Sequence, residues 1–166
     1  MGRICRIGWG AWVVLWATAI ASAQWTADGV NITGPSSSQS PYLHATQSSA
    51  QVKAILTVGD SVNARSNGTA YRLAGAPDGL GALNNGDGTF LLFVNHELPR
   101  HRGVPRAHGA RGAFISQWKI EAGTLRVIEG GDLITKTFQW DSAAKKYVDQ
   151  PATLGALCSA DLPAVS

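Results

Sequence analysis

Short apolar runs, each closed by a cluster of turn-forming residues, divide most of this chain and limit what it can fold into. The interruptions are rich in glycine, asparagine, aspartate and proline, which favour turns because they accept a positive or a fixed φ. No window of a dozen residues carries apolar side chains at helical spacing. Several short strands at close spacing predict an all-β fold. The runs are Ala54 to Val58, Tyr71 to Leu73, Phe90 to Val94, Ala113 to Ile120, Leu125 to Ile128 and Thr137 to Trp140.

Two stretches allow a more detailed prediction. Asn85-Gly86-Asp87-Gly88 precedes the third run, and Asn-Gly and Asp-Gly favour tight hairpin turns. We therefore expect a hairpin between a strand near Leu80 to Leu83 and the strand at Phe90 to Val94. In the fourth run the residues alternate with a period of two, which is typical of a half-buried strand. Phe114, Ser116 and Trp118 form one row, and Ile115, Gln117 and Lys119 form the other.

The N-terminal stretch has the order of a secretory signal. Arg3 and Arg6 precede an apolar run from Ile7 to Ile20, and Ala21-Ser22-Ala23 matches a signal cleavage site before Gln24. An uncleaved membrane anchor is the alternative, but it needs about 20 apolar residues. We expect residues 1–23 to be a signal peptide and the protein to be exported, either to the periplasm or outside the cell, without membrane association after cleavage.

The charge balance of the remaining chain is close to neutral. Arg3 and Arg6 would leave with the signal, so the 14 lysines and arginines fall to 12, against 11 acidic residues. A nucleic-acid surface requires clustered positive charge together with a binding motif. We therefore expect no nucleic-acid partner.

The rest of the chain divides by composition. Residues 24–51 are rich in serine, threonine, glutamine and proline, with too few large apolar residues to fold alone, and are predicted to be a partly ordered lead-in. Residues 52–166 hold the predicted strands. A propeller blade takes about 40 to 50 residues, so this region supplies about two to three blades, fewer than the four to eight or so of a closed ring. We expect an incomplete piece of a longer protein, although a complete small barrel or sandwich is an alternative.

The sequence Asn95-His96-Glu97 follows an apolar strand. Alternation along a strand places Asn95 and Glu97 on one face and His96 on the other. Hard cations such as Ca²⁺ bind carboxylate and amide oxygens together. The pattern is equally typical of a strand that ends in polar residues because it reaches water.

The next segment is basic and glycine-rich. It contains Arg100, His101, Arg102, Arg106, His108 and Arg111. Guanidinium groups bind phosphate oxygens in bidentate fashion, and a solvated loop would have the same composition. A zinc-protease motif is excluded, because Arg100 stands in place of the second histidine and Pro99 would break the helix. Further along, Cys158 offers either a soft ligand for iron or zinc or a buried apolar side chain.

Three segments in this order resemble the N-terminal part of the bacterial PhoX-like alkaline phosphatase family, over about residues 52 to 166. They are PDGLGALNNGDGTFLLFVNHELPR, RAHGARGAFISQWKIE and LCSADLP. The resemblance implies a β-propeller whose central opening holds calcium ions and iron that activate a phosphate ester for hydrolysis. It implies metal ligation by Glu97 and Asn95, contact of Cys158 with iron, and a phosphate-facing role for Arg100, Arg106 and Arg111.

The chain also departs from that family. PhoX-type enzymes carry a Trp-Gly-Thr-rich stretch and paired glutamates after their cysteine, whereas Ser159-Ala160-Asp161-Leu162 follows Cys158 here. The 166 residues alone are therefore expected to be inactive, and phosphomonoester hydrolysis is the activity implied for an intact relative. The alternative is a non-catalytic exported β-propeller or surface protein with at most a structural calcium.

Overall fold

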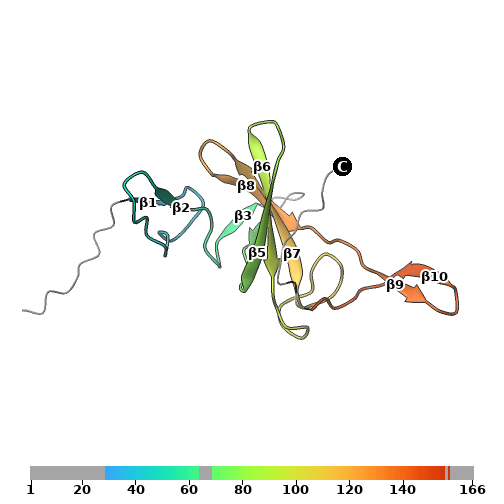
Figure 1. Cartoon of the computed structure of the whole chain (residues 1–166). Coiled ribbons are helices and arrows are strands. Elements are labelled where there is room, and N and C mark those ends of the chain that lie inside the picture. The colour runs from blue at the N-terminus through green and yellow to red at the C-terminus, as the bar shows by residue number, and fades with distance from the viewer. Residues whose placement is uncertain (1–28, 64–68, 156, 158–166) are drawn as a thin grey trace, which may run out of the picture.

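The computed structural model describes residues 29–63, 69–155 and 157, and within these residues the protein is entirely β-structure without a helix (Figure 1). The all-β prediction is therefore confirmed for this part of the chain. The expected signal peptide at residues 1–23 and Cys158 lie outside the described residues. No helix in the described part is long and apolar enough to cross a membrane.

A four-stranded antiparallel sheet forms the centre of the molecule. Its strands follow one another in chain order: β5 (Pro77–Asn84), β6 (Thr89–His96), β7 (Phe114–Glu121) and β8 (Val127–Asp132). The predicted hairpin is confirmed, because Asn84 pairs with Phe90 across the turn. Gly86 and Gly88 adopt φ values of 76° and 82° there, which explains why glycine occupies both positions.

The hydrophobic core lies on one face of this sheet. It consists of Leu73, Val94, Trp118, Ile120 and Val127. The predicted alternation in β7 is confirmed, since Phe114, Ser116, Trp118 and Ile120 are all buried. Gln117 on the opposite face is buried as well, with 6% of its surface exposed, so the second face of β7 is more covered than a half-buried strand requires.

A glycine in β8 makes room for the central tryptophan. Gly130 pairs with Trp118 across the β7–β8 ladder. A Cβ at Gly130 would lie 2.7 Å from two atoms of the Trp118 ring and 2.8 Å from Cδ1 of Tyr71. Only a residue without a side chain fits between these two aromatic rings.

A short hairpin covers the core face. It is formed by β3 (Ser61–Asn63) and β4 (Ala70–Arg72), both of which contact β8. Tyr71 of β4 packs against Trp118, with ring centroids 5.2 Å apart. The apolar run that begins at Ala54 contributes Ile55 and Leu56 to the same core from outside a strand.

An N-terminal unit precedes this hairpin. In it, β1 (Val30–Thr33) of the expected lead-in pairs in parallel with β2 (Gln51–Ala54), which begins at the last residue of the lead-in. Two hydrogen bonds join the unit to the first residue of β8 and to the turn that precedes it. The Val127 N–H donates to Ser36 Oγ at 3.0 Å, and Lys53 Nζ donates to the carbonyl of Thr124 at 2.7 Å.

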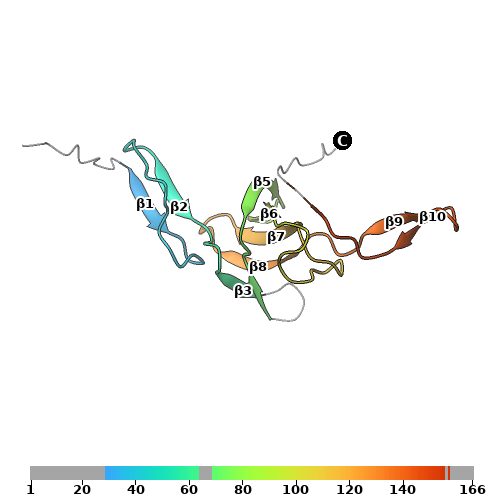
Figure 2. The same cartoon turned by 90° about the horizontal axis from the view of Figure 1, so that it is seen from below.

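A separate hairpin follows the central sheet. It is formed by β9 (Phe138–Asp141) and β10 (Lys146–Asp149). The hairpin and the β1–β2 unit lie on opposite sides of the central sheet (Figures 1 and 2). Trp140 and Tyr147 pair across its two strands, with ring centroids 5.3 Å apart and an interplanar angle of 70°.

Candidate functional site

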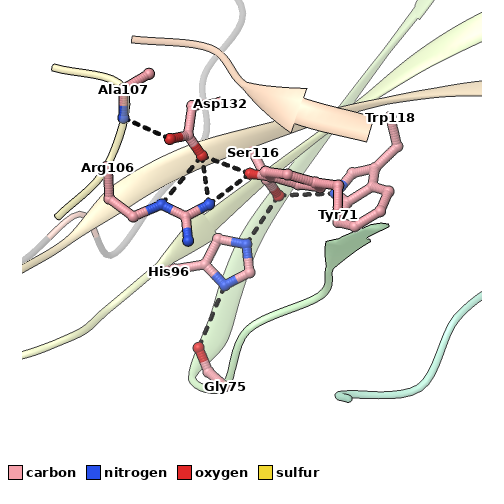
Figure 3. A network of polar contacts seen from close by, with 8 residues as sticks. All are labelled: Tyr71, Gly75, His96, Arg106, Ala107, Ser116, Trp118 and Asp132. Carbon is pink, nitrogen blue, oxygen red and sulfur yellow. Dashed lines mark hydrogen bonds and ion pairs between the residues drawn. The ribbon is translucent and has the colours of Figure 1, made fainter. Parts of the chain in front are cut away.

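A network of buried polar side chains lies at one end of the central sheet, on its core face (Figure 3). Because the paired residues of adjacent antiparallel strands point to the same face, the network collects side chains from three neighbouring strands. Tyr71 of β4 and Arg106 complete it. Arg106 lies in the segment of residues 100–111, which we call the basic loop. The strand residues are His96 of β6, Ser116 and Trp118 of β7, and Asp132 of β8.

The first half of the network is a chain of hydrogen bonds through one imidazole. His96 Nδ1 lies 3.2 Å from the Gly75 carbonyl, which can only accept, so Nδ1 carries the proton. His96 Nε2 therefore accepts a hydrogen bond from the Ser116 hydroxyl at 2.8 Å. The same Ser116 oxygen accepts from Trp118 Nε1 at 2.7 Å. Every polar atom of this chain is satisfied in the neutral state of His96.

The surroundings of His96 keep it neutral. Burial is the main cause that lowers its pKa, and the positive charge of Arg106 adds to the effect. The hydrogen bonds between His96 and the backbone of Gly75 and Ala74, together with the negative charge of Asp132, raise the pKa, but they are outweighed. The ring also stacks on Phe114, at 4.2 Å between centroids and 7° between planes.

The second half of the network is an ion pair between Arg106 and Asp132. Arg106 Nη2 and Nε both donate to Asp132 Oδ1, the latter at 3.1 Å. Tyr71 donates to the same oxygen at 2.5 Å and accepts from Arg106 Nη2 at 2.7 Å. The backbone N–H of Ala107 donates to Asp132 Oδ2 at 2.8 Å. The Arg106 guanidinium also lies over the Phe114 ring, 3.7 Å from its centroid.

These contacts shift two ionisation equilibria. Burial alone would raise the pKa of Asp132, but the hydrogen bonds from Arg106, Tyr71 and Ala107 outweigh burial and lower it. Burial and the neighbouring carboxylate raise the pKa of Tyr71 well above its ordinary value. At neutral pH the network therefore contains a carboxylate, a guanidinium, a neutral imidazole and a neutral phenol.

The Ser116–His96 contact has the geometry of an activated nucleophile, in which a hydroxyl donates to a neutral imidazole nitrogen. A nucleophile must also reach its substrate. Both side chains are fully buried, with 0% of their surface exposed. In this conformation the pair stabilises the sheet and offers no hydroxyl to a ligand.

The basic loop owes its shape to Arg106 and to short backbone hydrogen bonds. The Arg106 N–H donates to the Ala110 carbonyl at 2.9 Å, and the Gly109 N–H donates to the Arg106 carbonyl at 2.8 Å. The Gly112 N–H donates to the Arg102 carbonyl at 3.1 Å, which joins the two ends of the loop. His108 is buried at 3% exposure, and neither of its ring nitrogens makes a hydrogen bond to another residue in the described part of the chain.

Closure of the loop brings the backbone beside Arg111 close to that of Arg100 and Arg102. A Cβ at Gly112 would lie 3.2 Å from the Arg100 Cα, and the side chain of Arg100 lies against Gly155. Arg100, Arg102 and Arg111 are all exposed. Of the predicted phosphate-facing residues, Arg100 and Arg111 are thus exposed to solvent, whereas the Arg106 side chain forms an ion pair with Asp132.

The predicted metal ligands differ in their exposure. Asn95 is buried at 1% exposure within β6, while Glu97 is exposed one residue beyond the strand end, where its N–H donates to the Ala76 carbonyl at 2.9 Å. Cys158 is outside the described residues. Residues 29–63, 69–155 and 157 contain no group of three or more histidine, cysteine, aspartate or glutamate side chains that could hold a metal ion.

The donor set available here is therefore incomplete for the metals that the resemblance implies. Carboxylate and amide oxygens suit Ca²⁺, which takes about six to eight oxygen ligands. Asn95 and Glu97 supply only part of such a shell. A thiolate suits iron, but both cysteines, Cys5 and Cys158, lie outside the described part.

Comparisons of the chain with protein-family models, with curated proteins and with solved structures found no match.

Sequence reasoning missed most of the polar network. A serine and a histidine in otherwise apolar inward rows of β6 and β7 were the available signal for Ser116 and His96. Tyr71 and Asp132 carried no local signal. They are 61 residues apart in the chain and meet only through the packing of β4 on β8.

Proposed function

We propose that this chain is the N-terminal portion of an exported, PhoX-like metal-dependent phosphatase whose intact form hydrolyses phosphomonoesters. The strand order of the central sheet supports a propeller origin. A propeller blade is a four-stranded antiparallel meander, and β5 to β8 follow one another in that order.

The observation that carries the phosphatase proposal is the set of exposed arginines on the closed loop. Arg100, Arg102 and Arg111 are exposed, and the loop backbone is closed where Gly112 hydrogen-bonds to Arg102 and lies close to the Cα of Arg100. Guanidinium groups bind phosphate through two parallel hydrogen bonds. Arg106 anchors the loop through Asp132, so we assign phosphate contact to Arg100 and Arg111 and a structural role to Arg106.

Within this proposal, Glu97 is a ligand for calcium, and the buried side chain of Asn95 is a second ligand. Cys158 would contact iron. Bound metals would neutralise charge on the phosphate oxygens and activate the attacking oxygen. The remaining ligands would come from outside the described residues, so we assign no step of the reaction to the residues present here.

Hydrolysis of p-nitrophenyl phosphate by the full-length gene product, with calcium and iron added, tests the proposal. Loss of one charged hydrogen-bonding group costs about 1.5 to 3 kcal/mol, so Arg100→Ala and Arg111→Ala should each raise KM by roughly tenfold or more. Arg126→Ala removes an exposed arginine outside the loop, at the edge of β8, and should leave KM unchanged. Glu97→Ala should abolish metal-dependent turnover.

The hydrogen bonding within the buried network favours a second, non-catalytic function. His96, Ser116, Arg106 and Asp132 bond to one another and to the backbone, as in a structural scaffold. A non-catalytic exported β-propeller or surface protein would retain such a network. Turnover no greater than that of the Glu97→Ala variant would favour this scaffold function over the phosphatase.

A further inference from the structure

The β9–β10 hairpin carries exposed aromatic side chains on one face. Phe138 is 59% exposed, Trp140 57% and Tyr147 69%. Trp140 and Tyr147 are directly opposite each other in the ladder, and Phe138 lies two residues from Trp140 on the same side. We call Phe138, Trp140 and Tyr147 the aromatic face.

The hairpin is anchored firmly at its base. The Thr137 hydroxyl donates to the Gln150 carbonyl at 2.7 Å and accepts from the Ala152 N–H at 3.0 Å. Beyond it, Leu154 forms a bridge with Gly112 and accepts a hydrogen bond from the Ala113 N–H. The hairpin projects away from the central sheet on these connections (Figures 1 and 2). The aromatic face therefore lies on a hairpin whose base is closed and which projects away from the central sheet.

The charges around the aromatic face leave a cationic tip. Asp149 pairs with Lys136 at 2.8 Å, and the Asp141 carboxylate accepts from the N–H groups of Ala143 and Ala144 in the turn. Lys145 and Lys146 are exposed and have no ion-pair partner among the described residues. Asp149 is thus neutralised by Lys136, whereas Asp141 keeps its charge directly opposite Lys146 in the ladder, so Asp141, Lys145 and Lys146 together leave one net positive charge at the tip.

We propose that the β9–β10 hairpin docks on an anionic lipid bilayer, with the aromatic face in the interfacial region and Lys145 and Lys146 against anionic headgroups. Tryptophan and tyrosine are suited to that region because each combines an apolar ring with a polar tip. Apolar burial and attraction of lysines to anionic lipid together set the strength of such binding. The proposal is independent of the phosphatase function, and it replaces the expectation from the sequence that the protein does not associate with membranes.

Two observations favour a bilayer over other occupants. At the observed exposures the three rings offer roughly 300 to 450 Å², well below the 800 Å² or so per partner of a stable protein interface. A second copy of the chain would therefore bury too little surface through this face. A flat ligand could stack on both rings at once only if they were coplanar, but Trp140 and Tyr147 are inclined at 70°.

Vesicle binding by the full chain tests the proposal, with phosphatidylcholine vesicles that contain or lack phosphatidylglycerol. The apolar run Ile7 to Ile20 would also bind lipid and is the same in every variant, so the readouts must be local to the hairpin. They are amide hydrogen exchange of residues 138–148 and the Trp140 emission, taken as the difference between the wild type and Trp140→Phe. We expect protection and a blue shift with the anionic vesicles.

The variants separate the two contributions. Trp140→Ala with Tyr147→Ala should weaken hairpin-specific partitioning about tenfold or more. Lys145→Glu should weaken it by at least about fivefold on anionic vesicles, in a salt-dependent manner. Tyr42→Ser with Leu43→Ser changes an equally exposed apolar pair on the far side of the sheet and should leave hairpin protection unchanged.

Several results would overturn the proposal. These are equal hairpin protection by neutral and anionic vesicles, or absence of protection with both. Protection that depends on protein concentration without lipid and is lost in Trp140→Ala would assign the aromatic face to a second copy of the chain. Because Lys145 is an exposed turn residue, its charge reversal tests the proposal even if the aromatic double variant fails to fold.

Discussion

The guanidinium of Arg106 closes over the carboxylate of Asp132 and joins the basic loop to the last strand of the central sheet. The side chains of this pair are 12% and 9% exposed, respectively. Removal of one member of a buried pair leaves the other charge uncompensated, which typically costs about 3 to 5 kcal/mol. This relationship explains how a loop rich in glycine and arginine keeps a defined shape.

Asp132→Ala should therefore lower the free energy of unfolding by about 3 kcal/mol in urea titrations. Asp149→Ala is the matched control, because its pair with Lys136 is exposed at 49% and 65%. Exposed pairs contribute about 0.2 to 1 kcal/mol. Similar losses for the two variants would contradict a structural role for the Arg106–Asp132 pair.

Stability should fall as the pH drops below about 6.5, because the folded state lowers the pKa of His96. The unfolded state then binds the proton first, so acidification favours unfolding until the folded-state pKa is reached. His96→Gln cannot titrate and should show a smaller change in the urea midpoint between pH 7 and pH 5. His44→Gln, at an exposed position, should keep the wild-type dependence. If the urea midpoint of His96→Gln changed with pH as much as that of the wild type, His96 would not be the cause of the loss of stability in acid.

Ser116→Ala should destabilise the protein by about 2 to 4 kcal/mol, because Trp118 Nε1 and His96 Nε2 would both lose a buried partner. Ser142→Ala lies in the exposed β9–β10 turn and should change stability by less than about 0.5 kcal/mol. A fluorophosphonate probe should leave Ser116 unlabelled in the native protein. Native-state labelling would instead indicate a reachable nucleophile.

Gly130→Ala should lower stability by about 1 to 3 kcal/mol, because the new methyl group would overlap the rings of Trp118 and Tyr71. Gly123→Ala is the control. A Cβ at Gly123 meets nothing within 4 Å, and the residue lies in the β7–β8 turn. Thermal unfolding of both variants gives the comparison, and equal midpoints would show that the core adapts around Gly130.

Local chemistry predicted part of this fold. The Asn85-Gly86-Asp87-Gly88 turn and the alternation in β7 depend on φ preferences and on burial of one face, which short stretches of sequence record. The β1–β2 pair could not be predicted in the same way. The polar composition of this region suggests disorder, and the paired residues of β1 and β2 are 21 positions apart in the chain. Long-range pairing depends on the whole fold more than on either segment.

The candidate site was less predictable for the same reason. Arg106 was predicted to face phosphate, whereas its partner Asp132, 26 residues away, was not predicted to be a site residue. The sequence placed Asn95 and Glu97 on one face, yet Glu97 follows the last residue of β6 and is exposed, whereas Asn95 is buried. Strand alternation is a reliable guide only while the strand continues.

The two hydrogen bonds that fasten the N-terminal unit span 91 and 71 residues. A ribosome releases residues 29–54 well before their docking surface at Thr124 and Val127 emerges. Contacts between segments so distant in the chain form after local ones, because closing a long loop costs more entropy. The N-terminal unit is therefore expected to fold only after the central sheet on which it docks.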